Sequence, residues 1–219
     1  MSLRPTPMTD ALHDYVIAHG TPPDDTQEAL SRRTAELGYD ADMQISPDEG
    51  ALLSMLVRLT GATYVVEVGT FTGYSAVWLA RGLPEDGRLL CCDVNEEWTA
   101  VAREFWRRAG VDHRIELRLG PAAETLRELP TDPVVDLAFI DADKTGYPTY
   151  YEELLTRLRP GGLIAVDNTL SGGRVVDPEK GSDNTRAINS FNDALAADPR
   201  VDAVMLTVAD GVTLVRKRT

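Results

Sequence analysis

The apolar and polar positions of the chain follow the periods of short buried strands and amphipathic helices. The most informative stretch is 63–78, TYVVEVGTFTGYSAVW, in which an apolar run precedes a small-residue turn and an amphipathic segment. The run 64–68 is rich in β-branched residues and lacks strict polar alternation, which is typical of a central strand buried on both faces. Gly69 and Gly73 then allow a tight turn into a helix whose free N–H groups point above the sheet edge. The stretch therefore predicts a strand, a turn and a helix around a ligand.

Strand-like and helix-like runs alternate after this stretch. Further strands are expected over residues 88–93, 114–119, 134–140 and 163–166, with helices over about 96–109, from 121, and over about 147–158. Such alternation predicts a parallel sheet with helices on both faces. After a polar loop from 169 to 184 and a helix to about 197, apolar runs over 201–208 and 212–216 flank Asp210-Gly211, which indicates an antiparallel hairpin. The sequence thus predicts a doubly wound α/β fold that ends in a hairpin.

Three helices are predicted before the first strand. They extend over about 10–19, 25–38 and 47–61, with candidate N-caps at Thr9, Asp24 or Asp25, and Ser46. After Ser46, Pro47 suits the first helical position and Glu49 completes a capping box. We interpret 1–61 as a helical cap, with residues 1–8 as a mobile arm, and 62–219 as the α/β core that binds cofactor and metal in the same single domain.

Composition and charge narrow the functional classes. The chain has 219 residues, which fits one α/β domain with a substantial core. Its formal net charge of −13, with basic residues concentrated only at 103–108 and 216–218, disfavours nucleic acid and anionic membranes as partners. We expect neither a secretory signal nor a membrane-spanning helix. Cys91 and Cys92 are adjacent in a predicted strand, so they point to opposite faces and cannot form an ordinary disulfide, which suits a cytoplasmic protein.

The glycine turn points to a particular kind of ligand. Its spacing is Glu-x-Gly-x-x-x-Gly rather than the Gly-x-Gly-x-x-Gly of dinucleotide-binding folds. Glu67 would repel a pyrophosphate and attract a cationic group, such as the ammonium or sulfonium of S-adenosylmethionine. The alternative is that the turn is only a structural connection, since short glycine-containing loops between strands and helices are common.

Acidic residues follow several of the predicted strands. Ligands of open parallel sheets bind beyond the carboxyl ends of the strands. Asp93 ends the second strand, a little over 20 residues after Gly69, where an acid accepts hydrogen bonds from ribose hydroxyls. The alternative for Asp93 is a helix-capping or solvated loop acid.

Asp141, Asp167 and Asn168 follow the fourth and fifth strands. If these strands are neighbours, their ends lie about 5 Å apart, so that two carboxylates and an amide converge. Three oxygen ligands with open positions suit a hard divalent cation such as Mg²⁺. Two alternatives remain, namely that one acid caps the helix after its own strand or that Lys144 pairs with an acid.

Six stretches of the chain together resemble a known family: EVGTFTGYSA, LPEDGRLLCCDVN, GVDHRIELRLGPA, LAFIDADKTGYPTYYEELL, LRPGGLIAVDNTLSGGRV and DPRVDAVMLTVADGVTLVRKR. They look like the cation-dependent class I S-adenosylmethionine O-methyltransferases, the group of caffeoyl-CoA and catechol O-methyltransferases, and are more similar to the caffeoyl-CoA branch. The likeness extends over roughly residues 10–216. It implies a mostly parallel, Rossmann-like sheet of seven strands in the order 3-2-1-4-5-7-6, in which the last strand is antiparallel between strands 5 and 6.

The resemblance also implies roles for individual residues. Positions that match the family's cofactor contacts are Glu67, Gly69, Thr70, Ser75, Asp93, Ala122, Asp141 and Tyr150. The implied metal ligands are Asp141, Asp167 and Asn168, and Lys144 matches the lysine proposed as the base. The chain departs from plant relatives on the acceptor side, with Ser171 where they commonly have Trp, Ile45 near a position often Thr, and only Arg4 where they place Lys. These departures put a bulky CoA thioester acceptor in doubt.

The motifs and the resemblance together predict an enzyme that transfers a methyl group from S-adenosylmethionine to a hydroxyl of a catechol-like phenol. Mg²⁺ is the expected cation, with Mn²⁺ or Ca²⁺ as alternatives, and the resemblance implies a homodimer. A nicotinamide-dependent oxidoreductase is disfavoured because its glycine fingerprint is missing. A non-catalytic binding protein would be expected to have lost metal ligands, and none is lost. A methyltransferase acting on a modified RNA base remains a rival, although the acidic charge disfavours it.

Overall fold

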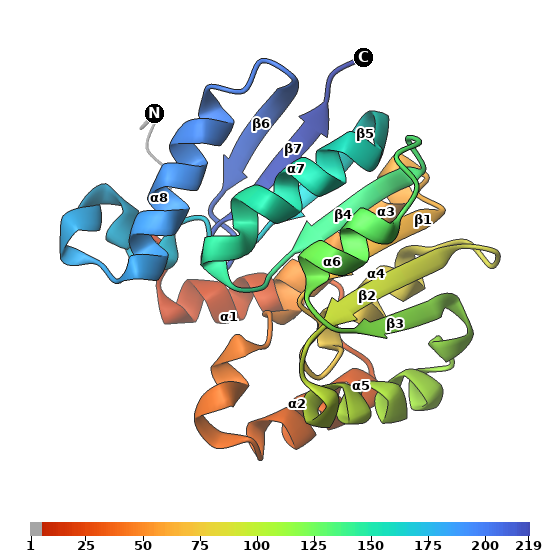
Figure 1. Cartoon of the computed structure of the whole chain (residues 1–219). Coiled ribbons are helices and arrows are strands. Elements are labelled where there is room, and N and C mark those ends of the chain that lie inside the picture. Colours follow the sequence, from red (N-terminus) through yellow and green to blue (C-terminus); the bar gives the residue numbers. More distant parts are fainter. Residues whose placement is uncertain (1–5) are drawn as a thin grey trace.

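The computed structural model describes residues 6–219 and is built around one twisted sheet (Figure 1). Its strands are β1 (Tyr64–Val68), β2 (Arg88–Asp93), β3 (Ile115–Leu119), β4 (Val135–Ile140), β5 (Leu158–Val166), β6 (Val201–Leu206) and β7 (Val212–Lys217). The strand order is β3-β2-β1-β4-β5-β7-β6, with β7 antiparallel to both of its neighbours and the other pairs parallel. The predicted sheet order is therefore confirmed.

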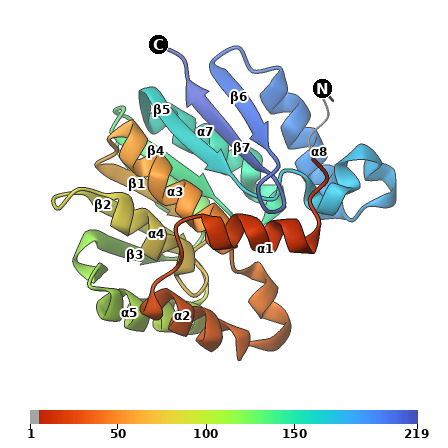
Figure 2. The same cartoon turned by 180° about the vertical axis from the view of Figure 1, so that it is seen from behind.

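Helices cover both faces of this sheet, as the alternating pattern predicts. One face packs on α3 (Pro47–Thr60), α4 (Tyr74–Gly82) and α5 (Glu96–Ala109), and the other on α6 (Ala122–Glu128), α7 (Tyr147–Arg157) and α8 (Asp183–Ala196) (Figures 1 and 2). Successive residues of a strand pack into two different hydrophobic cores, one on each face of the sheet. Cys91 lies in the core beneath α3, α4 and α5, and Cys92 lies in the core beneath α6, α7 and α8. Both cysteines are free, because their side chains project to opposite faces.

The strand ends are joined beyond the strands themselves. The N–H of Gly69 donates to the carbonyl of Cys92, that of Asp141 to Val68, and that of Asp167 to Ile140, at 2.8–3.0 Å. Since β1 has β2 on one side and β4 on the other, the direction of strand order reverses between them. The ends of the central strands therefore form one continuous edge at the place where ligands bind in such folds.

The N-terminal elements are α1 (Asp10–His19), α2 (Asp25–Ala35), the 3₁₀ segment η1 (Gly38–Met43) and α3. Figures 1 and 2 show α1 crossing the end at which the parallel strands finish, whereas α3 lies on one face of the sheet and α2 packs against α4 and α5. The second helix is shorter than predicted, because the chain tightens into η1 after residue 35. The capping box predicted at the start of α3 is wrong, since the Ser46 side chain makes no capping hydrogen bond.

Three further details differ from the sequence expectations. The fifth strand begins earlier than the predicted residue 163, because β5 starts at Leu158 and continues across a shift in its register with β4. The predicted polar loop from 169 to 184 contains the 3₁₀ segments η4 (Ser171–Val176) and η5 (Pro178–Lys180). The remaining 3₁₀ turns are η2 (Asp112–Arg114) and η3 (Lys144–Gly146). None of the helices described here is long and apolar enough to cross a membrane.

Candidate functional site

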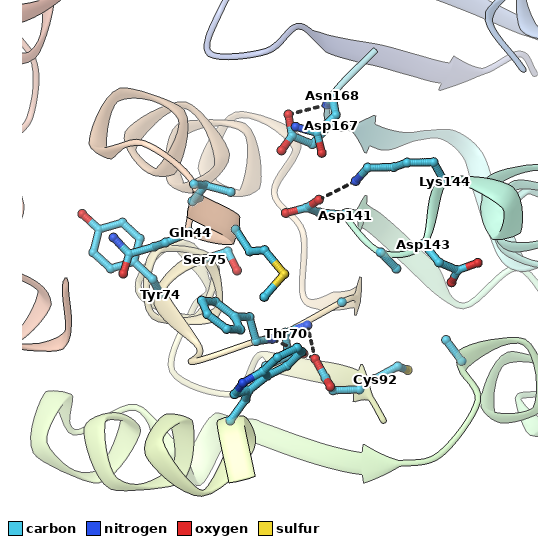
Figure 3. A pocket seen from close by; sticks show the side chains of 18 of the residues that line it. Gln44, Thr70, Tyr74, Ser75, Cys92, Asp141, Asp143, Lys144, Asp167 and Asn168 are labelled. Atoms are coloured by element: carbon cyan, nitrogen blue, oxygen red, sulfur yellow. Dashed lines mark hydrogen bonds and ion pairs between the residues drawn. The ribbon is translucent and has the colours of Figure 1, made fainter. Parts of the chain in front are cut away.

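A cavity of about 850 Å³ opens at the edge where the strand order reverses. Its lining includes nearly all of the predicted site residues, namely Gly69, Thr70, Ser75, Asp93, Ala122, Asp141, Lys144, Tyr150, Asp167 and Asn168. Figure 3 shows Thr70 at one end of this cavity and Asp141, Lys144, Asp167 and Asn168 gathered at the other. The first end is called the turn end below, and the second the acidic end.

Gly69 fixes the turn end. Its φ of 90° is one that residues with a side chain rarely adopt, and a Cβ at this position would lie 1.9 Å from the carbonyl oxygen of Asp141. The backbone of the turn therefore passes directly against the end of β4. Gly73 (φ 84°) then caps α4, and its carbonyl accepts a hydrogen bond from the indole N–H of Trp106 at 3.2 Å.

Asp93 organises this turn from the end of β2. Its Oδ2 accepts hydrogen bonds from the N–H groups of Thr70 (2.9 Å) and Phe71 (2.8 Å), and its Oδ1 accepts one from the N–H of Asn95 (2.8 Å). A carboxylate has about four acceptor positions, so at least one remains for a ligand in the cavity. Asp93 thus braces the turn from a buried position, and its role toward ribose stays a prediction.

Glu67 lies beneath the turn and, unlike the other predicted cofactor residues, does not line the cavity. It is fully buried; its Oε2 accepts from the Thr70 hydroxyl at 3.0 Å, and its Oε1 has no hydrogen-bond partner among the described residues. Burial raises the pKa of Glu67 to about 7, against the opposing effect of hydrogen bonds from Ser75, Cys91 and Thr70. A cationic ligand above the turn would favour its charged form.

Two aromatic side chains form a wall that the sequence analysis did not identify. Phe71, in the turn, and Trp98, on α5, meet edge to face with ring centroids 5.0 Å apart, and both line the cavity. Met43 of η1 lines it as well. Flat apolar side chains of this kind offer a surface on which an aromatic base can stack. The only signal in the sequence was the position of Phe71 inside the glycine turn.

The acidic end brings together the three predicted metal ligands. Asp167 follows β5 and is 4% exposed, and its Oδ1 accepts from the N–H of Asn168 at 2.5 Å. Asn168 has a φ of 57°, an uncommon conformation for a non-glycine residue, of the kind that functional sites retain. Burial, followed by the negative charge of Asp141, raises the pKa of Asp167 to about 8. These acids therefore lie together in a site that penalises their charges.

Lys144 is held against Asp141. Its Nζ donates to Asp141 Oδ1 at 3.0 Å and to the Tyr147 hydroxyl at 2.8 Å, and Tyr147 in turn donates to the carbonyl of Asp167 at 3.2 Å. The alternative in which Lys144 pairs with an acid is thus realised in this structure. An ammonium has three donors, so one remains for a ligand oxygen.

Glu49 is an acidic lining residue that the sequence analysis assigned to helix capping. It is 1% exposed, and its Oε1 has no hydrogen-bond partner among the described residues. Burial, followed by the negative charges of Asp167 and Asp141, raises the pKa of Glu49 to about 10. A sequence alone could not separate this residue from a capping glutamate, because both stand at the third position of a helix.

The oxygen-bearing side chains of the acidic end are of the chemical type that binds a hard divalent cation. Two carboxylates and an amide oxygen are ligands that Mg²⁺ accepts, and Glu49 Oε1 beside them is a buried oxygen without a hydrogen-bond partner among the described residues. Within residues 6–219, no group of three or more His, Cys, Asp or Glu side chains is close enough to hold an ion by itself. Any cation would therefore depend on Asn168, on water or on an acceptor for its remaining ligands.

The remaining predicted positions differ in their surroundings. Tyr150 and Ala122 line the cavity, and the Tyr150 hydroxyl donates to Asp143, another lining residue. Ile45 also lines it, whereas Ser171 is buried beside the Thr185 hydroxyl, 3.1 Å away, and takes no part in the lining. Arg4 lies outside the described residues.

Comparisons with known proteins agree with this geometry. A family model described as O-methyltransferase matches residues 21–218. Among curated relatives, "Probable caffeoyl-CoA O-methyltransferase 1" of Dictyostelium discoideum is 40% identical over 212 residues, covering 95% of this chain and 92% of the relative. Tricin synthase 1 of Oryza sativa subsp. japonica is 40% identical over 226 residues, covering 95% and 88%. The crystal structure of an O-methyltransferase from Bacillus cereus in complex with SAH has a TM-score of 0.87 at 35% identity, covering 95% of this chain and 97% of that one.

Proposed function

The chain belongs to the O-methyltransferase family and is an S-adenosylmethionine-dependent enzyme, and from this premise we propose that it methylates a hydroxyl of a catechol-like small phenol with the help of a divalent cation. The observation that carries the proposal is the acidic end of the cavity. There Asp141, Asp167 and Asn168 converge beside the buried Glu49, with one lysine among the lining residues that the structure describes.

The turn end is proposed to hold the methyl donor. The remaining acceptor position of Asp93 would supply a ribose contact, and the Phe71–Trp98 wall would supply a stacking surface. The carboxylate of Glu67 beneath the turn adds negative potential under a sulfonium. Because the transferred methyl is already activated on sulfur, the main task of these residues is alignment with the acceptor oxygen.

Asp141, Asp167 and Asn168 are proposed to hold the divalent cation. When bound, Mg²⁺ stabilises negative charge on a phenolic oxygen and lowers the pKa of that hydroxyl. Lys144 has one N–H left after its bonds to Asp141 and Tyr147. We propose that this N–H donates to the phenolic oxygen while the phenolic proton passes to water in the open cavity. As an ammonium Lys144 has no lone pair, so it would act as the base only after losing a proton of its own.

The acceptor is proposed to be a small phenol without a polyanionic carrier. Lys144 is the one Lys or Arg among the lining residues in the described part of the chain, whereas seven lining residues are Asp or Glu: Asp42, Glu49, Asp93, Asp141, Asp143, Asp167 and Asp210. A phosphate-bearing acceptor would find no second cation in this lining. The same argument, with the net charge of −13, disfavours an RNA acceptor.

Chelation tests the cation directly. We expect EDTA to abolish methyl transfer from labelled S-adenosylmethionine to 3,4-dihydroxybenzaldehyde, and Mg²⁺ or Mn²⁺ to restore it, because the ligands cannot neutralise the acceptor oxygen alone. SAH affinity, measured by calorimetry, should survive chelation. Asp167→Asn keeps the volume but removes a ligand charge, so it should raise the Mg²⁺ concentration needed for half-maximal activity by about tenfold or more. Asp86→Asn, in an exposed turn, is the matched control.

The result that would overturn the cation is full activity in chelator by protein without detectable metal. Asp167 and Asn168 would then be left as loop-bracing residues. Loss of SAH affinity on chelation would instead connect the metal to the donor, which the separate positions of the two cavity ends do not favour.

We also propose that two copies of the chain associate. Met55 and Leu59, one turn apart on α3, are 56% and 75% exposed, and Tyr15 of the neighbouring α1 is 59% exposed. Apolar side chains gathered on adjacent helices favour burial against a second copy. Light scattering at micromolar concentration should give the dimer mass, and Leu59→Glu should shift it toward the monomer. The monomer mass for the unchanged chain would contradict this proposal.

A further inference from the structure

Thr169 immediately follows Asn168 in the loop after β5 and is completely buried. Its N–H and its hydroxyl both donate to the carbonyl of Gly211 at 2.9 Å, and its own carbonyl accepts from the side-chain amide of Asn192 at 2.8 Å. The Thr169 hydroxyl also accepts from that of Thr213 at 3.0 Å. Every polar group of this residue is thus engaged, with the β6–β7 turn, with β7 and with α8.

The turn between β6 and β7 packs directly against this loop. The N–H of Leu170 donates to the carbonyl of Asp210 at 2.9 Å. A Cβ added at Gly211 would lie 2.5 Å from Cγ of Leu170 and 2.9 Å from its backbone nitrogen, and the φ of Gly211 is 88°, which favours glycine. The last hairpin of the chain therefore supports the loop, and its residues Ala209 and Asp210 line the same cavity as Asn168.

Asn168 needs such support because of its backbone conformation. A non-glycine residue with a φ of 57° keeps that conformation only where the surrounding structure determines it. The bonds that Asn168 makes itself are local, to Asp167 at 2.5 Å and from the N–H of Ser171 at 3.1 Å. The side-chain-mediated bonds of Thr169 instead reach residues 23 to 44 positions further along the chain. The direction of the Asn168 side chain therefore depends on the residue that anchors its backbone.

The amide oxygen of Asn168 is the one neutral protein ligand proposed for the cation. Figure 3 shows Asn168 next to Asp167 at the acidic end. Groups that orient a metal ligand commonly change metal affinity by about tenfold or more when they are removed. A residue that fixes Asn168 should therefore affect cation binding without touching the cation.

We propose that Thr169 is a positioning residue of the cation site. Its hydroxyl fastens the loop after β5 to the β6–β7 turn and thereby holds the Asn168 amide beside Asp167. The inference rests on the proposed cation-dependent function. The C-terminal hairpin, which lies next to β5 in the sheet, is then part of the cation site through Thr169.

The affinity of the full chain for Mn²⁺, measured by electron paramagnetic resonance without acceptor, tests this role. Thr169→Val keeps nearly the same shape, removes the hydroxyl donor to Gly211 and leaves the Thr213 hydroxyl without its acceptor, so it should weaken Mn²⁺ binding by about tenfold. Thr169→Ser keeps the hydroxyl and should bind Mn²⁺ nearly as tightly as the unchanged protein. SAH affinity, measured by calorimetry, should be unchanged in both variants, because the turn end does not depend on this loop.

Thr213→Val is a second, milder variant. It leaves the bond from Thr169 to Gly211 in place, so Mn²⁺ binding should weaken by about threefold, the effect of losing one ordinary hydrogen bond. Added to Thr169→Val it should have no further effect, because both substitutions act through the same hydroxyl. Thr99→Val is the matched control. This buried threonine donates to two carbonyls at the start of α5, and its substitution should leave Mn²⁺ affinity unchanged.

Several results would overturn the inference. Unchanged Mn²⁺ affinity in Thr169→Val would show that the hydroxyl positions nothing, and if that variant does not fold, unchanged affinity in Thr213→Val would show the same. Equal losses in Thr169→Ser and Thr169→Val would assign the effect to side-chain shape, and a parallel loss of Mn²⁺ and SAH affinity would assign it to general loss of structure. An unchanged protein that binds no Mn²⁺ would overturn the proposed cation site itself, which the other results leave intact.

Discussion

The two ends of the cavity are built on opposite electrostatic principles. At the turn end, Asp93 braces three backbone N–H groups and its negative charge is matched by these donors. At the acidic end, burial and mutual repulsion raise the pKa of Asp167 to about 8 and that of Glu49 to about 10. The first end is therefore complete without a ligand, whereas the second holds acids that a ligand would relieve.

The two ends therefore differ in how ligand binding affects the stability of the protein. A turn with satisfied backbone donors keeps its shape when it is empty, which lowers the entropy lost on binding. A cluster of buried acids lowers the stability of the empty protein and returns that free energy when a cation binds. We therefore expect substitutions at the turn end to damage shape and those at the acidic end to change the response to charge.

The largest effect should come from Gly69→Ala. The added Cβ would lie 1.9 Å from the carbonyl oxygen of Asp141 in a residue with φ of 90°, so the end of β4 must move. We expect a loss in the free energy of unfolding on the order of 4 kcal/mol, measured by urea denaturation, together with loss of SAH binding.

Gly110→Ala is the matched control for this change. Gly110 has a φ of 68°, but a Cβ added there would meet no described atom within 4 Å, so only the backbone strain is added. Its cost should be about 1–2 kcal/mol, with SAH affinity retained. Equal losses in the two variants would contradict the close approach of β1 and β4 as the reason for glycine at position 69.

Glu67→Gln tests the buried acid beneath the turn. The pKa of Glu67 is raised to about 7 from its ordinary 4.5, so the folded state holds the proton more tightly than the unfolded state. This contribution to stability is full below the ordinary pKa and is lost as pH rises through the folded one. Between about pH 5 and pH 8, the unfolding free energy of the ligand-free protein should therefore fall by on the order of 2–3 kcal/mol more than that of Glu67→Gln.

Urea denaturation at several pH values measures this difference. Glu97→Gln, an exposed acid on α5, should follow the unchanged protein and serves as control. Parallel curves for Glu67→Gln and the unchanged protein would show that burial does not hold a proton on Glu67.

The smallest expected effect is that of Asp93→Asn on the donor. The substitution keeps an acceptor oxygen for the turn but removes the charge that would bind ribose hydroxyls. SAH affinity, measured by calorimetry, should fall by about 1.5–2 kcal/mol, the range of hydrogen bonds to a charged group. Asp93→Ala also frees the N–H groups of Thr70 and Phe71, so it mixes a loss of shape with a loss of contact. Unchanged SAH affinity in Asp93→Asn would remove Asp93 from ribose recognition.

The parallel part of the fold could be predicted because its signal is local. The β-branched run 64–68 and the glycine turn after it specify strand, turn and helix within a few residues. The boundary of β5 could not be predicted, because the strand contains Pro160, Gly161 and Gly162, residues that usually interrupt a strand. Its pairing with β4 passes over them, from Leu158 opposite Val135 to Leu163 opposite Leu137, and the strand continues across this irregularity.

The candidate site was predictable where residues follow strand ends and was missed elsewhere. Asp141 and Asp167 meet because parallel strands finish at one edge, which a sequence reveals once the strands are assigned. Glu49 and Trp98 reach the same cavity from helices, and which face of a helix points to the site depends on tertiary packing. The bond between Lys144 and Asp141 is likewise a matter of side-chain geometry that spacing alone leaves open.

The backbone hydrogen bonds that continue past β1, β4 and β5 fix the spacing between the ends of these strands. Through Gly69, Asp141 and Asp167 they join the turn end of the cavity to its acidic end, and neighbouring strands keep a spacing of about 4.8 Å. If the two ends hold donor and acceptor as proposed, the distance between them is set by the peptide backbone rather than by any one side chain. Substitutions in η1 or at the start of α8, whose residues also line the cavity, would then change its shape without changing that distance.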